Sequence, residues 1–449
     1  MKACIVGAGD GGAMAANQMR RLDSKAQIDI FSKRLELGCP PCEMPLVISR
    51  SVATWDELIR GFRRRSFWEK RNINLHLNTE VTDILPAGKY IMAGGARYGY
   101  DRLVLALGAT PSIPSFPGLD GKNEFALSTD MADGIALENA ISRYAEAAIV
   151  GGGFIGLEIA TALRARGYLK TYLLVRRGIL QAYLDEDMAE TLEGVIKQNG
   201  LELIMPAKIE SIASGATKKH IRLFDRQLEV DFVFFATGTK PNVGLARKAG
   251  LQIGETGAIA VNRYLQTGDP DIYAIGDCIE NWDIITHTKR RHQLAANAVR
   301  TGYIAGRNAV LGNHITYEGT VMPFVTKVFG HQVGAVGLTE GEARERGLDT
   351  VSVTIDTPRL RERFNGCPTR YRLIADGKTR TLVGAQIVSE EIVSGTVDKL
   401  AVAIASKMPL IRLVQIDSCY SPHVQEDQLA VPLHRLIDKL PKASSMEVI

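Results

Sequence analysis

Two copies of a glycine fingerprint constrain this 449-residue chain more than any other feature. The first occupies residues 7–12 and the second occupies residues 151–156. Each follows a short apolar run and precedes a stretch with helical periodicity. Strand, glycine turn and helix in this order form the phosphate-binding unit of dinucleotide-binding folds. One such motif is weak evidence, but two complete copies predict an α/β chain with two Rossmann-like nucleotide-binding domains.

Each glycine has a definable task in such a turn. The first one, Gly7 or Gly151, permits the tight turn, and the second, Gly9 or Gly153, lets a pyrophosphate approach the backbone. The third lets the helix pack closely against the strand, and the helix N-terminus then faces the phosphates. The other residues that we assign to these two sites are Asp10, Gly12, Gly156 and Glu158.

The two units differ where the second strand of each one ends. An acidic residue is expected there to bind the ribose hydroxyls. The first unit has Ser32, followed by Lys33 and Arg34, and a serine binds a hydroxyl without charge assistance. The second unit has Arg176 and Arg177, whose guanidinium groups suit a 2′-phosphate. NADPH is therefore predicted in preference to NADH, the alternative being two solvated arginines beside NADH.

Three later apolar strands also end in small-residue turns that a cofactor can approach closely. One ends at Ala109 and Thr110, and a second repeats the same pattern up to Gly238. A third ends in Gly276 and Asp277, where the carboxylate can accept hydrogen bonds from cofactor hydroxyl groups. The alternative for this last turn is an ordinary surface turn.

Residues 38–45 carry two thiols at C-x-x-C spacing. Two prolines separate Cys39 from Cys42, and a helix through residues 46–48 is predicted to start next to Cys42. A helix N-terminus favours a thiolate and lowers its pKa, so Cys42 is the candidate redox thiol. A turn that brings the sulfurs together would permit a Cys39–Cys42 disulfide. The alternative is two buried residues that only pack.

The composition does not indicate binding to nucleic acid or to a membrane. A net charge of +4 requires no attraction to nucleic acid or to a membrane. No signal peptide and no apolar run of membrane-spanning length is recognisable, so a cytoplasmic protein is expected. The remaining cysteines are too scattered for a secreted disulfide framework or a metal site; they are at positions 4, 278, 367 and 419.

A run of arginines interrupts this even charge distribution. It falls within residues 54–67, which we predict to form one amphipathic helix with Thr54 as its N-cap. Such a run is usually a solvated helix face. The alternative is a docking surface for a protein partner. The run consists of Arg60, Arg63, Arg64 and Arg65.

The last part of the chain is strand-rich from residue 326 and then has two helical stretches, at 394–406 and 430–440. Their apolar faces predict an α+β dimerisation domain. Between the helices, Tyr420 and His423 could bring a hydroxyl and an imidazole to a thiol site. The predicted domains are residues 1–115 with 245–325, residues 116–244, and residues 326–449.

The order of these motifs resembles that of the pyridine nucleotide-disulfide oxidoreductases. Within this family it is most similar to the single-cysteine branch, which contains coenzyme A disulfide reductases, NADH oxidases, NADH peroxidases and persulfide reductases. The resemblance spans essentially the whole chain. It rests on both fingerprints and on the segments 42–45, 106–111, 236–238, 274–277 and 420–422.

The resemblance implies FAD on the first domain, NADPH or NADH on the second, and a homodimer built by the third. It implies Cys42 as the redox cysteine and Tyr420 reaching it from the partner subunit. The expected activity is reduction of a disulfide, persulfide or polysulfide. A flavin electron-transfer module serving a protein partner and an NAD(P)H oxidase remain alternatives. Asp10, where oxidases and peroxidases carry a histidine, disfavours peroxide reduction.

Overall fold

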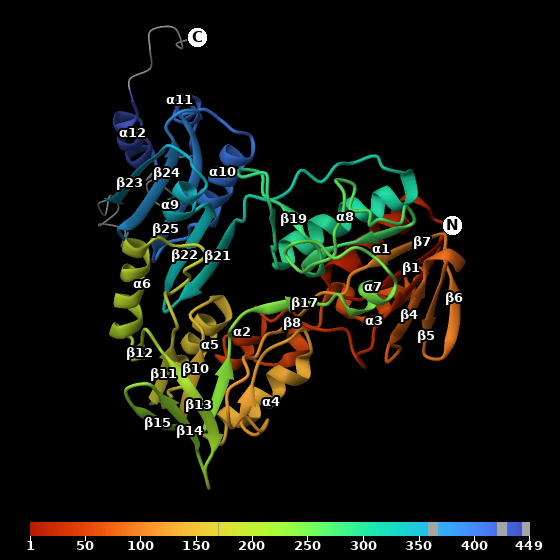
Figure 1. Ribbon diagram of the computed structural model, residues 1–449, viewed down its shortest axis with the longest axis horizontal. Coiled ribbons are helices and arrows are strands. Elements are labelled where there is room, and N and C mark those ends of the chain that lie inside the picture. Colours follow the sequence, from red (N-terminus) through yellow and green to blue (C-terminus); the bar gives the residue numbers. More distant parts are fainter. Residues whose placement is uncertain (169, 358–366, 420–428, 442–449) are drawn as a thin grey trace.

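A computed structural model describes residues 1–168, 170–357, 367–419 and 429–441. Figure 1 shows three lobes: the N-terminal sheet on the right, a second sheet at the lower left and the C-terminal domain at the upper left. The sheet topology explains this arrangement, because each lobe is built on its own five-stranded sheet. Among the described residues, no helix has both the length and the apolarity needed to cross a membrane.

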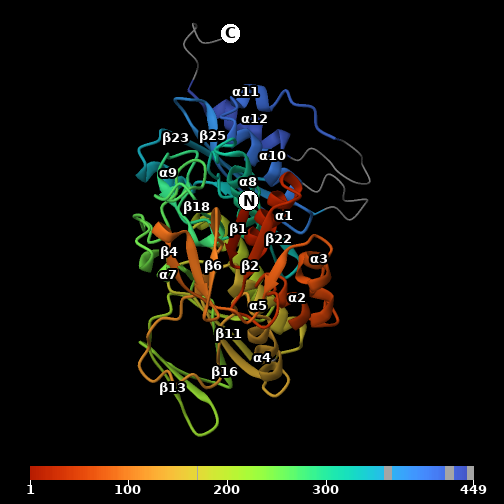
Figure 2. The same cartoon turned by 90° about the vertical axis from the view of Figure 1, so that its right-hand side faces the viewer.

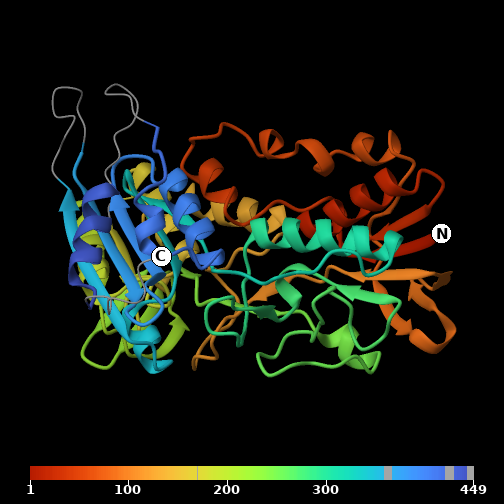
Figure 3. The ribbon, with the colours of Figure 1, turned by 90° about the horizontal axis from the view of Figure 1, so that it is seen from above.

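The first sheet is entirely parallel and has the strand order β18-β7-β1-β2-β3. Its central strands are buried on both faces, which explains their continuous apolar runs. Helix α8 (Ala295–Leu311) lies along α1 (Asp10–Leu22) (Figure 3). The two helices are so close that a side chain on Gly302 would collide with the Gly11 carbonyl. The strands are β1 (Lys2–Val6), β2 (Gln27–Phe31), β3 (Asn74–His76), β7 (Arg102–Leu105) and β18 (Ile272–Ala274).

The second sheet repeats this design with the order β12-β11-β10-β16-β9. Helix α2 (Met44–Ile48), from the cysteine segment, packs against α4 (Met131–Ile141) and α5 (Phe154–Ala165) of this lobe (Figure 2). The thiol segment is therefore held between the two nucleotide-binding lobes. The other elements are β9 (Glu124–Phe125), β10 (Glu146–Val150), β11 (Lys170–Leu174), α6 (Glu186–Gln198), β12 (Glu202–Ile204) and β16 (Phe232–Phe235).

Short antiparallel strands connect these two lobes or lie at their margins. The strands that leave the two lobes, β8 (Ala109–Pro111) and β17 (Thr239–Pro241), pair with each other. This pairing brings two of the predicted cofactor turns together, which the sequence did not predict. The remaining elements here are β4 (Val81–Leu85), β5 (Tyr90–Ala93), β6 (Ala96–Gly99), β13 (Ile209–Ser214), β14 (Lys219–Leu223), β15 (Gln227–Val230), α7 (Gly244–Lys248), β19 (Asn281–Trp282) and β20 (Lys289–Arg290).

The C-terminal domain is an antiparallel sheet of order β21-β22-β25-β24-β23, packed against helices α10 and α12. The two helices predicted at 394–406 and 430–440 are present with nearly the expected bounds. The fold class is confirmed, while the domain boundaries stay a prediction. The elements are β21 (Phe324–Val328), β22 (His331–Gly337), α9 (Glu340–Glu345), β23 (Thr350–Thr357), β24 (Thr369–Asp376), β25 (Thr381–Ser389), α10 (Ser394–Ala405), α11 (Leu410–Leu413) and α12 (Ala430–Lys439).

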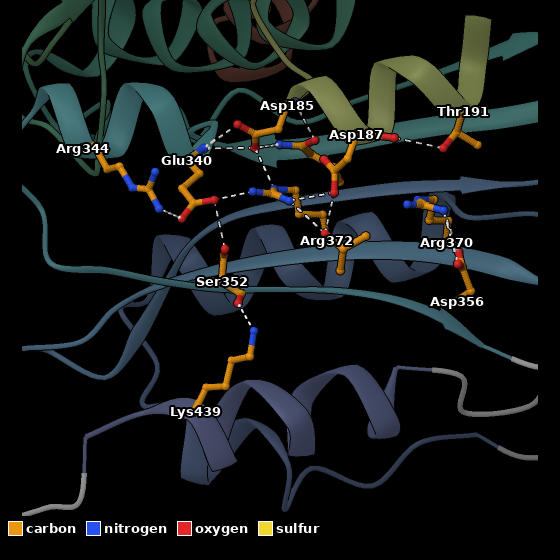
Figure 4. Close-up of polar contacts among 12 residues, drawn as sticks. Asp185, Asp187, Thr191, Glu340, Arg344, Ser352, Asp356, Arg370, Arg372 and Lys439 are labelled. Atoms are coloured by element: carbon orange, nitrogen blue, oxygen red, sulfur yellow. Dashed lines mark hydrogen bonds and ion pairs between the residues drawn. The ribbon is translucent and has the colours of Figure 1, made fainter. Parts of the chain in front are cut away.

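An ion cluster joins the second nucleotide-binding lobe to this sheet (Figure 4). At its centre is Arg372 of β24, whose Nε donates to Asp185 Oδ2 at 3.1 Å and whose Nη1 donates to Asp187 Oδ2 at 2.8 Å. Its Nη2 donates to Glu340 at the start of α9. Asp185 also accepts from the Gln386 amide at 2.6 Å. All three carboxylates therefore bond to the same guanidinium where α6 meets the C-terminal sheet.

The single helix predicted over residues 54–67 is wrong. Thr54 does cap a turn, but that turn is a 3₁₀ helix, Trp55–Leu58, followed by another at Gly61–Arg63 and by helix α3 (Arg65–Glu69). Gly61 has φ +61°, a left-handed conformation that a continuous helix cannot contain. Because the chain turns here, the arginine run no longer lies on one face.

Candidate functional site

The two glycine fingerprints have the same local geometry. A side chain on Gly7 would collide with the Ala106 carbonyl, and one on Gly151 would collide with the Ala236 carbonyl. Both glycines have positive φ, +112° and +122°. By contrast, a Cβ on Gly9 meets no described atom within 4 Å. A Cβ on Gly153 likewise meets no described atom within 4 Å. Each turn is therefore crowded at its first glycine and open at its second, where a pyrophosphate approaches.

The third glycines also repeat. A Cβ on Gly12 would collide with the Gly7 carbonyl, and a Cβ on Gly156 with the Gly151 carbonyl. Helix α1 is capped by Gly9 and helix α5 by Gly153. Both helix N-termini therefore begin at the open side of their turn, as phosphate binding requires.

Two carboxyl groups face the first turn. Burial raises the pKa of Asp277 to about 6, with a further contribution from the Asp10 charge. Its Oδ1 is buried and has no hydrogen-bond partner among the described residues. Burial also raises the pKa of Asp10, against the opposing effect of Arg63. A buried acceptor without a partner calls for a donor such as a ligand hydroxyl.

Glu158 lies in the first turns of α5, on the side of the second fingerprint. Its Oε1 accepts from the Thr326 hydroxyl at 2.7 Å. Its Oε2 is buried, and the described part of the chain offers it no partner. Burial raises its pKa, since a charged carboxylate is poorly solvated there. Burial thus favours the protonated form of the Glu158 carboxyl group.

Cys42 is an exposed free thiol in the turn that precedes α2. The predicted lowering of its pKa is wrong. Surrounding protein raises the pKa to about 11, mainly by desolvation, and then through the charges of Glu158 and Glu43. Helix α2 has only five residues, so its dipole is too small to offset these carboxyl groups. Asp10 contributes in the same direction, so groups from both nucleotide-binding lobes act on this sulfur.

Cys39 is a buried free thiol. Its Sγ contacts the Pro40 carbonyl at 3.6 Å and Glu43 Oε2 at 3.9 Å. Burial raises its pKa to about 12, with a further contribution from Glu43, while Arg63 opposes the shift. Its backbone N–H donates to the Thr129 carbonyl at 3.1 Å, which holds it against the loop before α4. One thiol is therefore exposed and the other enclosed.

Arg63 is the residue that sequence reasoning misplaced. Its side chain is only 9% exposed. Nη2 makes an ion pair with Asp10 Oδ1 at 3.2 Å, and Nε donates to the Gly38 carbonyl at 3.1 Å. Glu43 was also missed as a neighbour of both thiols. Only its position directly after Cys42 signalled it, and no pattern in the sequence signalled the inward turn of Arg63.

The strand ends differ in accessibility. Ser32 Oγ accepts from the backbone N–H of Arg34 at 3.3 Å, and Arg34 Nη1 donates to the Thr129 carbonyl at 3.0 Å. Lys33 is exposed. Arg176 and Arg177 are both exposed at the end of β11, where a 2′-phosphate could reach them.

The remaining predicted residues fall into two groups. Thr110 pairs with Lys240 across β8 and β17, next to Ala109 and the exposed Gly238, so these turns lie together. Gly276 has φ +73° and directly precedes Asp277 at the first turn. Tyr420 and His423 lie outside the described residues.

Comparison with known proteins agrees with this architecture. Residues 1–302 match the family described as pyridine nucleotide-disulphide oxidoreductase, and residues 324–429 match its dimerisation domain. The NADH oxidase of Methanocaldococcus jannaschii is 32% identical over 437 residues, which are 94% of this chain and 95% of the relative.

A second relative is the NAD(P)H coenzyme A polysulfide/persulfide reductase of Pyrococcus horikoshii, 30% identical over 87% of this chain and 88% of the relative. The solved structure of an NAD-dependent persulfide reductase from A. fulgidus has a TM-score of 0.93 at 29% identity, over 98% of this chain and 83% of the other. The chain therefore belongs to the pyridine nucleotide-disulphide oxidoreductase family and is an FAD-dependent NAD(P)H oxidoreductase.

Proposed function

We propose that the enzyme uses electrons from NAD(P)H to reduce a sulfur–sulfur bond, in a persulfide, polysulfide or disulfide, at Cys42. The observation that carries this proposal is the position of Cys42: it is exposed, and Asp10 of the first lobe and Glu158 of the second both act on it electrostatically. A thiol between two nucleotide-binding turns can receive electrons from one side and substrate from the other. The relatives named as sulfur and persulfide reductases support this assignment.

The residues of the first lobe fit FAD. The open front of Gly9 gives space for the pyrophosphate at the N-terminus of α1. The unpartnered Asp277 Oδ1 suits a ribityl hydroxyl, which would supply the missing donor. Ser32, Lys33 and Arg34 would line the adenosine end. Ala109, Thr110 and Gly276 would lie against the cofactor from the adjacent turns.

The second lobe would hold the nicotinamide cofactor. Gly151, Gly153 and Gly156 would bind its pyrophosphate, and Glu158 would lie toward the nicotinamide. The exposed Arg176 and Arg177 suit the 2′-phosphate of NADPH. The bound cofactors together supply two electrons to the thiol site.

The chemistry at Cys42 is thiol–disulfide exchange. The Cys42 thiolate attacks one sulfur of the substrate, which forms a mixed disulfide and releases the other sulfur as a thiolate. Two electrons then cleave the mixed disulfide, returning Cys42 to its thiolate and releasing the second product, and both products take up protons. Glu158, whose charge acts on Cys42 and whose pKa is raised by burial, would hold the proton that Cys42 loses.

The wider setting is also a proposal. The match to a dimerisation domain supports a homodimer, in which Tyr420 and His423 would reach the thiol site of the partner subunit. The protein would act in the cytoplasm on a small-molecule substrate. A protein partner that exchanges electrons with the flavin is the second arrangement to test, because ferredoxin reductases share the fold.

The test is turnover of NADPH with polysulfide, coenzyme A persulfide and coenzyme A disulfide, each under anaerobic conditions, in the wild type and in Cys42→Ser. The proposal expects sulfide or thiol production that falls at least about a hundredfold in the variant, as for loss of a covalent nucleophile. Cys367→Ser, a partly exposed cysteine of the C-terminal domain, is the control and should keep full activity.

Two results would contradict the proposal. Oxygen-dependent NADPH consumption without any sulfur reduction would favour an oxidase, the activity named for the Methanocaldococcus jannaschii relative. Reduction of an artificial electron acceptor that survives in Cys42→Ser, again with no sulfur substrate turned over, would favour the electron-transfer arrangement.

A further inference from the structure

Arg63 connects two segments that are distant in the sequence. Its Nη2 reaches Asp10, inside the first glycine fingerprint, and its Nε reaches the carbonyl of Gly38, the residue before Cys39. Gly38 is itself crowded, because a Cβ there would collide with the Thr129 carbonyl. The thiol segment is thus held by a guanidinium on one side and by the Thr129 loop on the other.

The same guanidinium lies among acidic groups. The charges of Arg63 and Glu43 both act on Asp10 of α1, and the charge of Asp10 acts in turn on Asp277. The charge of Glu158 of α5 acts on Cys42 from the second lobe. Formation of a thiolate adds one more negative charge. Arg63 opposes the increase in the pKa of Asp10 and of Cys39, so its charge favours the ionised form of both groups.

We propose that Arg63 is a positioning residue for the thiol site: it fastens the Gly38–Cys39 segment to the first fingerprint and neutralises Asp10, so that the Cys42 thiolate can form. The role of Arg63 in turnover rests on the proposed function. The contacts of Arg63 with Asp10 and Gly38 do not depend on that function. The neighbouring Arg64 gives a natural contrast, because it is exposed and its Nε donates to the Ile59 carbonyl at 2.9 Å.

The experiment measures the pH dependence of Cys42 alkylation by iodoacetamide in the FAD-loaded enzyme, followed by peptide mass spectrometry. Arg63→Met should make alkylation at a fixed pH below the thiol pKa on the order of tenfold slower, which corresponds to about one pKa unit. Arg63→Lys retains the charge and should restore most of the rate. Arg64→Met, the matched control, should alkylate as the wild type does.

Asp10→Asn supplies the second arm. It removes a negative charge beside the thiols, so alkylation should become faster than in the wild type. In this background, Arg63→Met should have at most about a third of its effect, because the charge that it neutralised is gone. Equal profiles for Arg63→Met and Arg64→Met, or an Asp10→Asn profile equal to that of the wild type, would overturn the proposal.

Failure to fold leaves the proposal testable. If Arg63→Met does not retain FAD, then Asp10→Asn decides, and an alkylation profile equal to that of the wild type contradicts the proposal. The readout also separates this inference from the proposed function, because alkylation requires no turnover. Sulfur reduction that survives in Cys42→Ser would refute the proposed function and leave the alkylation result standing.

Discussion

Two arginines, Arg63 and Arg372, lie among carboxylates in different parts of the molecule. Arg372 is 14% exposed and directs its three nitrogens to Asp185, Asp187 and Glu340. Arg63 is 9% exposed and makes one ion pair, with Asp10, and one bond to a backbone carbonyl. Both side chains join segments that are far apart in the sequence.

The two arginines differ in how the carboxyl groups near them are bonded. Around Arg372 the carboxylates are held by direct bonds, and Gln386 and Ser352 add further donors (Figure 4). Beside Arg63, burial raises the pKa of Asp10. Burial and the charge of Asp10 raise the pKa of Asp277 to about 6. Carboxylates that all bond to one guanidinium are typical of a structural contact, whereas carboxyl groups with a raised pKa beside thiols are typical of a reaction site.

Removing Arg372 from its cluster should have the largest effect on the free energy of unfolding. Arg372→Met leaves Asp185 and Asp187 without a counter-charge, while Glu340 keeps its ion pair with Arg344, and should lower the free energy of unfolding by about 3 kcal/mol. Urea unfolding measures this loss. Arg222→Met is the control, since the Arg222–Glu210 pair is largely exposed and should contribute under about 1 kcal/mol.

The comparison also predicts what this variant leaves unchanged. Cys42 alkylation in the folded Arg372→Met enzyme should follow the wild-type pH profile, because the cluster lies at the C-terminal sheet. A shifted profile would mean that Arg372 and Arg63 are coupled. It would contradict the distinction between a structural contact at Arg372 and a reaction site at Arg63.

Asp277 extends the comparison to a carboxyl group with no guanidinium at all. Its pKa of about 6 lies above the usual value, so the folded FAD-free chain binds this proton more tightly than the unfolded chain does. Stability from this group is therefore full at low pH and is lost as the pH rises from about 4 to about 6. Asp277→Asn should gain about 2 kcal/mol over the wild type across that window.

Unfolding of the FAD-free protein at pH 4.5 and pH 7, two values that bracket about 6, measures this gain. Bound FAD should abolish it, because a hydroxyl donor stabilises the carboxylate. An Asp277→Asn gain that is the same at both pH values would show that the carboxyl group is not the titrating group.

The smallest expected effect is on cofactor binding, when the exposed Arg176 and Arg177 are replaced. Their double change to Ala should raise the KM for NADPH about tenfold, about 1.4 kcal/mol, and leave that for NADH within about twofold. Both values come from steady-state kinetics at one salt concentration. Equal changes for the two cofactors would remove the charge argument for NADPH.

Strict local requirements explain what was predictable. A turn that excludes a side chain at Gly7 and at Gly151 leaves a fixed glycine spacing in the sequence, so both nucleotide-binding units were recognisable. Helices α10 and α12 were found because their apolar periodicity reflects one buried face. Their apolar faces predicted a dimerisation domain, and the family resemblance then implied a homodimer built by it.

Long-range contacts explain what was not predictable. The inward turn of Arg63 depends on Gly61, on Asp10 and on the Gly38 carbonyl, and these lie in three separate segments. The pKa of Cys42 depends on Glu158, which is more than a hundred residues away. The pairing of β8 with β17 likewise joins two lobes, and no periodicity in either strand encodes it.

The most direct test of the central claim is an anaerobic titration of the FAD-loaded enzyme with NADPH, followed by the flavin spectrum. A redox sulfur centre downstream of the flavin should make enzyme oxidised at Cys42 take up two electrons before the flavin bleaches. Cys42→Ser should bleach from the first addition. Intact mass before and after reduction would then distinguish a Cys39–Cys42 disulfide from a thiol bound to Cys42. Bleaching from the first addition in both proteins, with Cys42 shown by mass to be oxidised at the start, would contradict electron transfer to this thiol.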